Sequence, residues 1–287
     1  MEIPAATRML NQAAYYLHVR AQYRTAEPLY RRALDIREKV LGAEHPDTAT
    51  SLNNLAALLN HQGKYEEAES LFRRALEIRE KVLGTEHPNT AISLNNLAEQ
   101  LRSLRKYEEA GPLYRRALGI RERALGAEHP DTAISLDNLA IFLRNQGKYE
   151  EAELLCWRAL GIFEKVLGAE HPDTAINLNN LALLLNNQGK YEEAEPLCRR
   201  ALGIWEKALG AEHPDMGGSL NNLAQILGCQ GRMGEAEPLC RRAFAILEKA
   251  LGIKHPSTIT VGKNLVLFLR EQGKEAEAEA LERRMKE

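Results

Sequence analysis

The chain has 287 residues, with 38 lysines and arginines against 40 aspartates and glutamates and a formal net charge of −2. This balance argues against the basic excess of nucleic-acid and anionic-membrane binders. No stretch reaches the roughly 18 apolar residues of a membrane span, and the start lacks the basic and then apolar stretch of a signal peptide. We therefore expect a soluble cytoplasmic protein that binds neither nucleic acid nor membrane.

A 42-residue period runs through nearly the whole chain. The dipeptide His-Pro recurs with this spacing at positions 45, 87, 129, 171, 213 and 255. Such a period indicates an array of stacked supersecondary units, and it leaves no residues for a linker or a second domain. The predicted organisation is one array over residues 1–287, with repeats at approximately 5–42, 45–84, 87–126, 129–168, 171–210, 213–252 and 255–287.

Each repeat is predicted to contain two antiparallel helices. In the second repeat, apolar residues from Leu52 to Leu59 recur at i, i+3, i+4 and i+7, which is the spacing of one helix face. A polar break follows, and a second helical stripe runs from Ala68 to Leu83. Gly84 then ends the second helix and Pro88 opens the next repeat, in agreement with the preferences of helix ends and starts.

This helix pair resembles the tetratricopeptide repeat. Ala68 and Phe72 match the family's Ala-x3-Phe signature in the second helix, and Ala26 and Tyr30 come close to it. The 42-residue length and the strings Ser-Leu-Asn-Asn-Leu-Ala, Lys-Tyr-Glu-Glu-Ala-Glu and Arg-Glu-Lys-Val-Leu-Gly resemble the repeats of kinesin light chains. The resemblance implies an all-α fold, a right-handed superhelical solenoid of about seven antiparallel helix pairs.

The resemblance also implies that the first helix of each repeat lines a concave groove that binds an extended peptide or a partner protein. One column of groove positions is Asn11, Asn53, Asn95, Asp137, Asn179 and Asn221. Asparagine offers both a donor and an acceptor, so this ladder can pair with a peptide backbone of any sequence. The neighbouring column is interpreted as structural, satisfying buried polar groups of adjacent helices. It consists of Asn54, Asn96, Asn138, Asn180 and Asn222.

Two further columns of the first helices are candidates for ligand contact. Arg102 and Arg144 stand at equivalent positions of successive repeats, where they can clamp an acidic side chain or a terminal carboxylate. A solvated pair of arginines is the alternative. Ile92, Ile134 and Ile176 form an apolar column that either offers a pocket or packs between repeats.

Other recurring residues are interpreted as structural. The six His-Pro histidines are expected to cap the first helices or to pack the loops rather than to bind metal, because successive copies lie about 10 Å or more apart. Cys156, Cys198 and Cys240 stand in the column of the buried aromatic residues and are predicted to be core, whereas Cys229 faces the groove side. Gly119, Gly161 and Gly203 stand in the middle of the second helices, where glycine is unfavourable. The interpretation that we consider for them is close packing between repeats.

No catalytic motif is present, because the sequence contains no Gly-x4-Gly-Lys-[Ser/Thr], Gly-x-Ser-x-Gly or His-Glu-x-x-His. We therefore expect no enzymatic activity, no cofactor and no metal. The predicted function is the binding of a peptide or protein ligand. The ligand is expected to be acidic if the arginines take part, and the protein is expected to be a monomer. Two alternatives remain. One is a sensor or autoinhibitory domain of a larger signalling NTPase, and the other is an assembly scaffold that associates through its edges.

Overall fold

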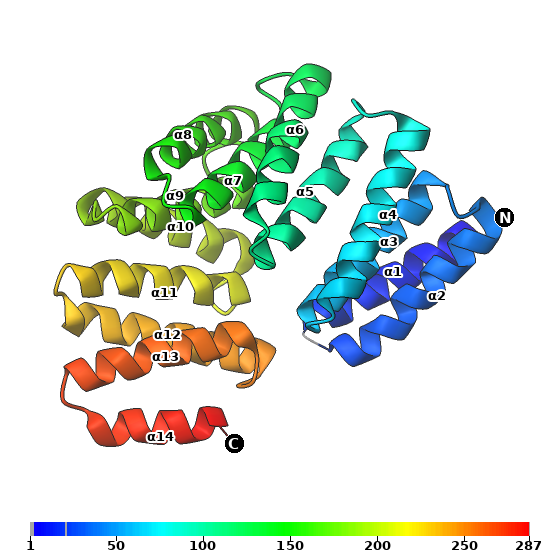
Figure 1. Cartoon of the computed structure of the whole chain (residues 1–287). Coiled ribbons are helices and arrows are strands. Elements are labelled where there is room, and N and C mark those ends of the chain that lie inside the picture. Colours follow the sequence, from blue (N-terminus) through cyan, green and yellow to red (C-terminus); the bar gives the residue numbers. More distant parts are fainter. Residues whose placement is uncertain (1–2, 21, 287) are drawn as a thin grey trace. The chain divides into compact units, whose positions relative to one another are not determined.

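The computed structural model describes residues 3–20 and 22–286. This part of the chain consists of α-helices joined by short turns and contains no β-strand, which confirms the all-α class (Figure 1). The helices are α1 (Ile3–Val19), α2 (Tyr23–Leu41), α3 (Pro46–His61), α4 (Tyr65–Leu83), α5 (Pro88–Ser103), α6 (Tyr107–Leu125), α7 (Pro130–Asn145), α8 (Tyr149–Val166), α9 (Pro172–Asn187), α10 (Tyr191–Leu209), α11 (Pro214–Cys229), α12 (Met233–Leu251), α13 (Pro256–Glu271) and α14 (Glu275–Lys286).

Histidine and glycine mark the ends of these helices. His45 Nδ1 accepts a hydrogen bond from the backbone N–H of Asp47 at 3.1 Å, and Pro46 is the first residue of α3. The other five His-Pro histidines make the same bond to the residue two positions further on. The predicted capping role is therefore confirmed. At the opposite end of a pair, Gly84 follows α4 with a φ of 94°, a conformation that favours glycine.

The chain divides into two compact halves, an N-terminal half of residues 1–142 and a C-terminal half of residues 143–287, and the division falls within α7. In the N-terminal half, α1 packs against α2, α3 against α4 and α5 against α6. In the C-terminal half, the pairs are α9 with α10, α11 with α12 and α13 with α14. Each even-numbered helix also contacts the odd-numbered helix that follows it within its half, so a helix pair buries its apolar face against its neighbours.

Small and branched apolar residues fill the interior of each half. In the N-terminal half, Ala49 and Leu52 of α3 pack with Ala75 and Ile78 of α4. One column of the even-numbered helices is buried from α2 to α12, as Tyr30, Phe72 and Tyr114 in the N-terminal half and as Cys156, Cys198 and Cys240 in the C-terminal half. This burial confirms that the three cysteines belong to the core, and Cys229 is exposed as expected.

The glycines in the middle of the even-numbered helices are not places of close packing. A Cβ atom at Gly161 or Gly203 would meet no atom within 4 Å. At Gly119, a Cβ atom would meet only the flexible end of Arg123, whose Nη1 atom would lie 3.2 Å away. The interpretation of this column as a close approach between repeats is wrong, because no neighbouring helix covers that side of the helices.

Candidate functional site

The odd-numbered helices present an exposed side that carries most of the predicted site residues. We call this surface the odd-helix face of each half; it carries Ile92 and Ile134 in the N-terminal half and Ile176 in the C-terminal half. These side chains are 36%, 39% and 46% exposed, respectively. In the N-terminal half, Ile92 and Ile134 stand exposed at the same position of successive repeats, which suits an apolar ligand.

The first asparagine column lies deeper in the N-terminal half than the sequence predicted. Asn53 and Asn95 are only 5% and 6% exposed. Asn53 Nδ2 donates a hydrogen bond to Ser93 Oγ at 3.1 Å, and Asn95 Nδ2 donates one to Ser135 Oγ at the same distance. These bonds join α3 to α5 and α5 to α7. Asp137 is buried as well, while Asn11 of α1 is half-buried.

In the C-terminal half the same column also bonds between helices. Asn179 Oδ1 accepts hydrogen bonds from Ser219 Oγ and from Asn222 Nδ2, both at 3.1 Å. Asn221 Oδ1 accepts a bond from Asn264 Nδ2 at 2.9 Å. The amide groups of this column therefore connect α9 to α11 and α11 to α13.

The two asparagine columns differ in exposure in part of the chain only: Asn53, Asn95 and Asn221 of the first column are buried, whereas Asn179 is half-buried. The second column, interpreted as structural, is half-buried rather than covered: Asn54, Asn96, Asn138, Asn180 and Asn222. Adjacent residues point about 100° apart on a helix, and the next odd-numbered helix covers Asn53 and Asn95. Asn53 Oδ1 and Asn95 Oδ1 nevertheless lack a hydrogen-bond partner, and such buried acceptors cost about 1–3 kcal/mol each.

Arg102 is already bound to a carboxylate. Its Nε donates a hydrogen bond to Glu99 Oε2 at 2.9 Å, and its Nη2 contacts the other oxygen of that carboxylate. The Tyr114 hydroxyl donates to Glu99 Oε2, also at 2.9 Å. Burial alone would raise the pKa of Glu99, but the bonds from Arg102 and Tyr114 lower it overall. An acidic ligand would therefore have to displace Glu99 from Arg102. Arg144, the other arginine of the predicted clamp, is half-buried and belongs to the C-terminal half.

A second arginine column, which the sequence analysis did not single out, is buried beside the odd-numbered helices. Arg79 Nη1 donates to the backbone oxygen of Asn89 at 2.8 Å and to Ser93 Oγ at 3.1 Å. Arg121 makes the corresponding bonds to Asp131 and Ser135. Burial lowers the pKa of both arginines. The sequence shows this column as a change from arginine in the N-terminal half to apolar residues in the C-terminal half, which are Phe163, Trp205 and Leu247.

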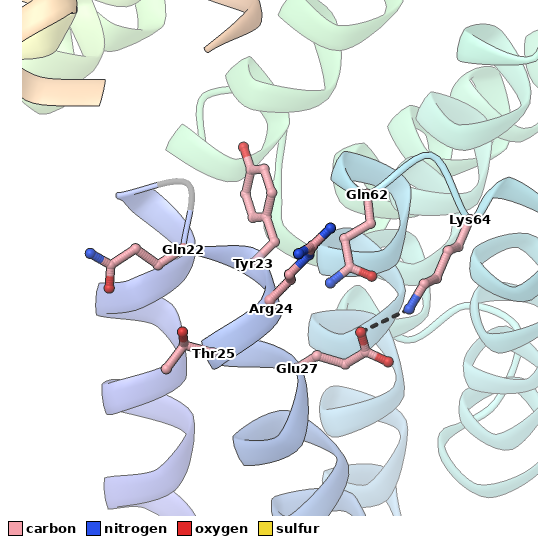
Figure 2. A pocket seen from close by; sticks show the side chains of 7 residues that line it. All are labelled: Gln22, Tyr23, Arg24, Thr25, Glu27, Gln62 and Lys64. Carbon is pink, nitrogen blue, oxygen red and sulfur yellow. Dashed lines mark hydrogen bonds and ion pairs between the residues drawn. The ribbon is translucent and has the colours of Figure 1, made fainter. Parts of the chain in front are cut away.

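A polar hollow of about 590 Å³ lies at the start of α2 (Figure 2). Lys64 Nζ donates to Glu27 Oε2 across it at 2.8 Å. Burial alone would raise the pKa of Glu27, but hydrogen bonds from Lys64 and other donors lower this pKa to about 2. The same ion pair recurs further along the chain, for example between Lys106 and Glu69 at 2.8 Å. Because the contact repeats with the helix pairs, we interpret it as part of the packing between them.

Within the described residues, no three histidine, cysteine, aspartate or glutamate side chains come together in a way that could hold a metal ion. The same part of the chain contains no helix that is both long and apolar enough to cross a membrane.

Family models described as tetratricopeptide repeat match residues 5–81, 47–110, 92–155, 137–186 and 215–285, and a second such model matches residues 174–215. The chain belongs to the tetratricopeptide repeat family. The fold of the family is typical of protein–protein interaction modules. The search of curated proteins found no match to this sequence.

Solved structures place the chain close to kinesin light chain repeats. It is 30% identical to the nearly identical repeats of a protein described as a kinesin light chain from Podosopora anserina, with a TM-score of 0.58, over 71% of this chain and 97% of that one. It shares its fold with RapI, at 20% identity and a TM-score of 0.67, over 96% and 95% of the two chains. It also shares its fold with a Rap protein complexed with competence and sporulation factor, at 18% identity and a TM-score of 0.61, over 95% and 76%.

Proposed function

We propose that this tetratricopeptide repeat protein is a non-enzymatic interaction module whose odd-helix face binds an extended segment of a partner protein. The observation that carries the proposal is the register of exposed isoleucines, Ile92 and Ile134 in the N-terminal half and Ile176 in the C-terminal half. An extended segment that crosses the odd-numbered helices of the N-terminal half meets an isoleucine and a half-buried amide in each of two successive repeats, and α9 of the C-terminal half offers the same pair. This pairing offers side-chain burial and backbone hydrogen bonds together.

The two asparagine columns have different roles in this proposal. The half-buried second column, such as Asn54 and Asn96, contacts the backbone of the bound segment directly. The first column holds the odd-numbered helices at a fixed spacing through bonds such as that from Asn95 to Ser135. Its unpaired acceptors, Asn53 Oδ1 and Asn95 Oδ1, become available to a donor of the ligand only if the amides turn outward.

Arginine does not restrict the ligand to acidic sequences in this proposal. Glu99 already neutralises Arg102, so an added carboxylate gains little there. One fold relative is named for its complex with competence and sporulation factor. That complex supports ligand binding by a helix-pair array of this fold.

The test is a selection of phage-displayed random linear peptides on the full chain, followed by titration of the selected peptides by fluorescence anisotropy. We expect Ile134→Lys or Ile176→Lys to weaken each peptide by at least about tenfold, because each places a charge among apolar contacts. The matched control is Leu154→Lys, at a side chain of α8 that is 73% exposed. Binding that survives both isoleucine changes but is lost in the control would assign the site to the even-numbered helices instead.

A further inference from the structure

The C-terminal half contains a hollow of about 680 Å³ on its odd-helix face. It lies where α9, α11 and α13 follow one another, and α11 contacts both of the others. Ile176, Gly218 and Thr260 line its rim, one from each of these helices, and Trp205 and Leu247 line it from the even-numbered helices. Trp205 and Leu247 are 4% and 3% exposed, so they form a packed apolar floor.

The hollow exists because two columns of the repeat change their residues here. Gly218 stands at the position that Ile92, Ile134 and Ile176 occupy in three other repeats. A Cβ atom at Gly218 would meet no atom within 4 Å, so the neighbouring helices have not closed over the missing side chain. Trp205 and Leu247 replace the arginines of the N-terminal half, which makes the floor apolar.

The rim of the hollow is polar and carries a negative charge. Of the described residues that line it, Asp215 is the one with an ionisable side chain, and that side chain is 58% exposed. Asn222 Nδ2 donates a hydrogen bond to Asn179 Oδ1. This bond does not use Asn222 Oδ1 or Asn179 Nδ2, which can bond to other groups at the rim. An apolar cavity with a few polar groups at its edge is the usual form of a side-chain binding pocket.

We infer that this hollow receives a bulky apolar side chain, aromatic or leucine, from the bound segment, and that a lysine or arginine beside it pairs with Asp215. The inference rests on the proposed function, because it names the ligand class of the same odd-helix face. An aromatic side chain buries about 150–250 Å² of surface, which gives the contact with Trp205 and Leu247 its strength. The exposed ion pair adds little attraction, but Asp215 repels an acidic neighbour and so selects the flanking residue.

The decisive variant is Gly218→Ile, because it restores the residue that three other repeats carry and fills the hollow without a clash at Cβ. The probes are the peptides selected from the phage library, each compared with a version in which its bulky apolar residue is alanine. Gly161→Ile, on the outer side of α8, is the matched control for the same substitution in a helix. Thermal unfolding of all variants is measured alongside.

We expect peptides with a bulky apolar residue next to lysine or arginine to bind Gly218→Ile at least about tenfold more weakly than the unchanged protein. Gly161→Ile should bind as the unchanged protein does. The alanine versions should bind weakly to both Gly218→Ile and the unchanged protein, because they no longer use the hollow. Asp215→Lys should exchange the preferred flanking residue from basic to acidic.

Two outcomes overturn the inference and separate it from the proposed function. If Gly218→Ile binds every selected peptide as tightly as the unchanged protein does, while Ile134→Lys or Ile176→Lys weakens binding, the odd-helix face binds peptides without using the hollow. If no peptide is selected, or if none of these changes alters the binding, both the hollow and the proposed function are wrong.

Discussion

The two halves of the molecule use one repeat but fill it with different chemistry. In the N-terminal half, the even-numbered helices carry a buried aromatic residue such as Tyr114 and, seven positions later, a buried arginine such as Arg121. In the C-terminal half, the first position is a cysteine such as Cys198, and the second is bulky and apolar, as at Trp205. In α8 and α10 the bulky aromatic side chain thus stands two turns further along the same helix face, at Phe163 and Trp205 instead of the cysteine positions.

The exchange also reverses a hydrogen bond between the odd-numbered helices. In the N-terminal half, Ser93 Oγ accepts from Arg79 and from the amide nitrogen of Asn53. In the C-terminal half there is no arginine at this position, and the hydroxyl of Ser219 donates to Asn179 Oδ1 instead. A serine can do both because its hydroxyl is donor and acceptor. The hydroxyl therefore accepts where an arginine is present and donates where the position is apolar, and the hollow lies beside the apolar residues.

The largest expected effect concerns the apolar floor of the C-terminal half. Trp205→Ala should lower the free energy of unfolding by about 3–5 kcal/mol, because it leaves a large cavity. Trp157→Ala, at a side chain that is 43% exposed, is the control and should cost about 1 kcal/mol or less. Chemical denaturation measures both. Equal losses would show that the floor is not tightly packed.

Arg121 provides the corresponding test in the N-terminal half. Arg121→Ala should lower the free energy of unfolding by about 2 kcal/mol, because Asp131 and Ser135 lose a charged donor in a buried setting. Arg121→Met should lose less, since methionine restores apolar packing without a charge to bury. Denaturation curves of the two variants decide between them. A larger loss for methionine than for alanine would mean that the guanidinium is not the source of the stability.

Between about pH 6.5 and 4, a pair of histidines in the N-terminal half is expected to make the stability depend on pH. The ring centroids of His18 and His61 lie 4.9 Å apart, with Tyr23 and Tyr30 beside them. Burial, and then the charge of His61, lower the pKa of His18 to about 4 from 6.5. The fold therefore favours the neutral form of His18. The free energy of unfolding is not reduced by this histidine above about pH 6.5, and it falls as the pH drops towards 4.

Because the ring is only half-buried, we expect the free energy of unfolding to fall by no more than about 1–2 kcal/mol across this range. Unfolding curves at several pH values measure the slope. The slope should shrink in His18→Asn, and it should be unchanged in His213→Asn, which removes a helix cap of the C-terminal half. An unchanged slope in His18→Asn would assign the effect to other groups.

The smallest expected effect is a gain in stability at the open glycines. Gly161→Ala and Gly203→Ala should each raise the free energy of unfolding by about 0.8–1 kcal/mol, because alanine favours the helix and its Cβ meets no atom within 4 Å. Gly217→Ala is the opposing control, since its Cβ would lie 2.6 Å from Leu247 Cγ. Thermal unfolding measures all three. A gain at Gly217 would contradict the packing of α11 against α12.

The sequence by itself determined the helix pairs and their ends, the histidine caps and the buried cysteines, because these depend on residues within one or two turns of each other or on a column repeated through the chain. Only the tertiary structure decided which amide column is covered. Asn53 and Asn54 are neighbours in sequence, and the packing of α5 against α3 buries the first and leaves the second half-exposed.

The tertiary structure alone also showed where charge and space are available. The sequence placed Arg102 on a candidate clamp, but Tyr114, from the next helix, joins it in holding Glu99. The sequence has Gly218 where three other repeats have isoleucine, but only the structure shows that the helices around it leave a hollow over Trp205. Whether a missing side chain leaves space or lets its neighbours close in depends on the rigidity of everything packed around it, and no local pattern encodes that.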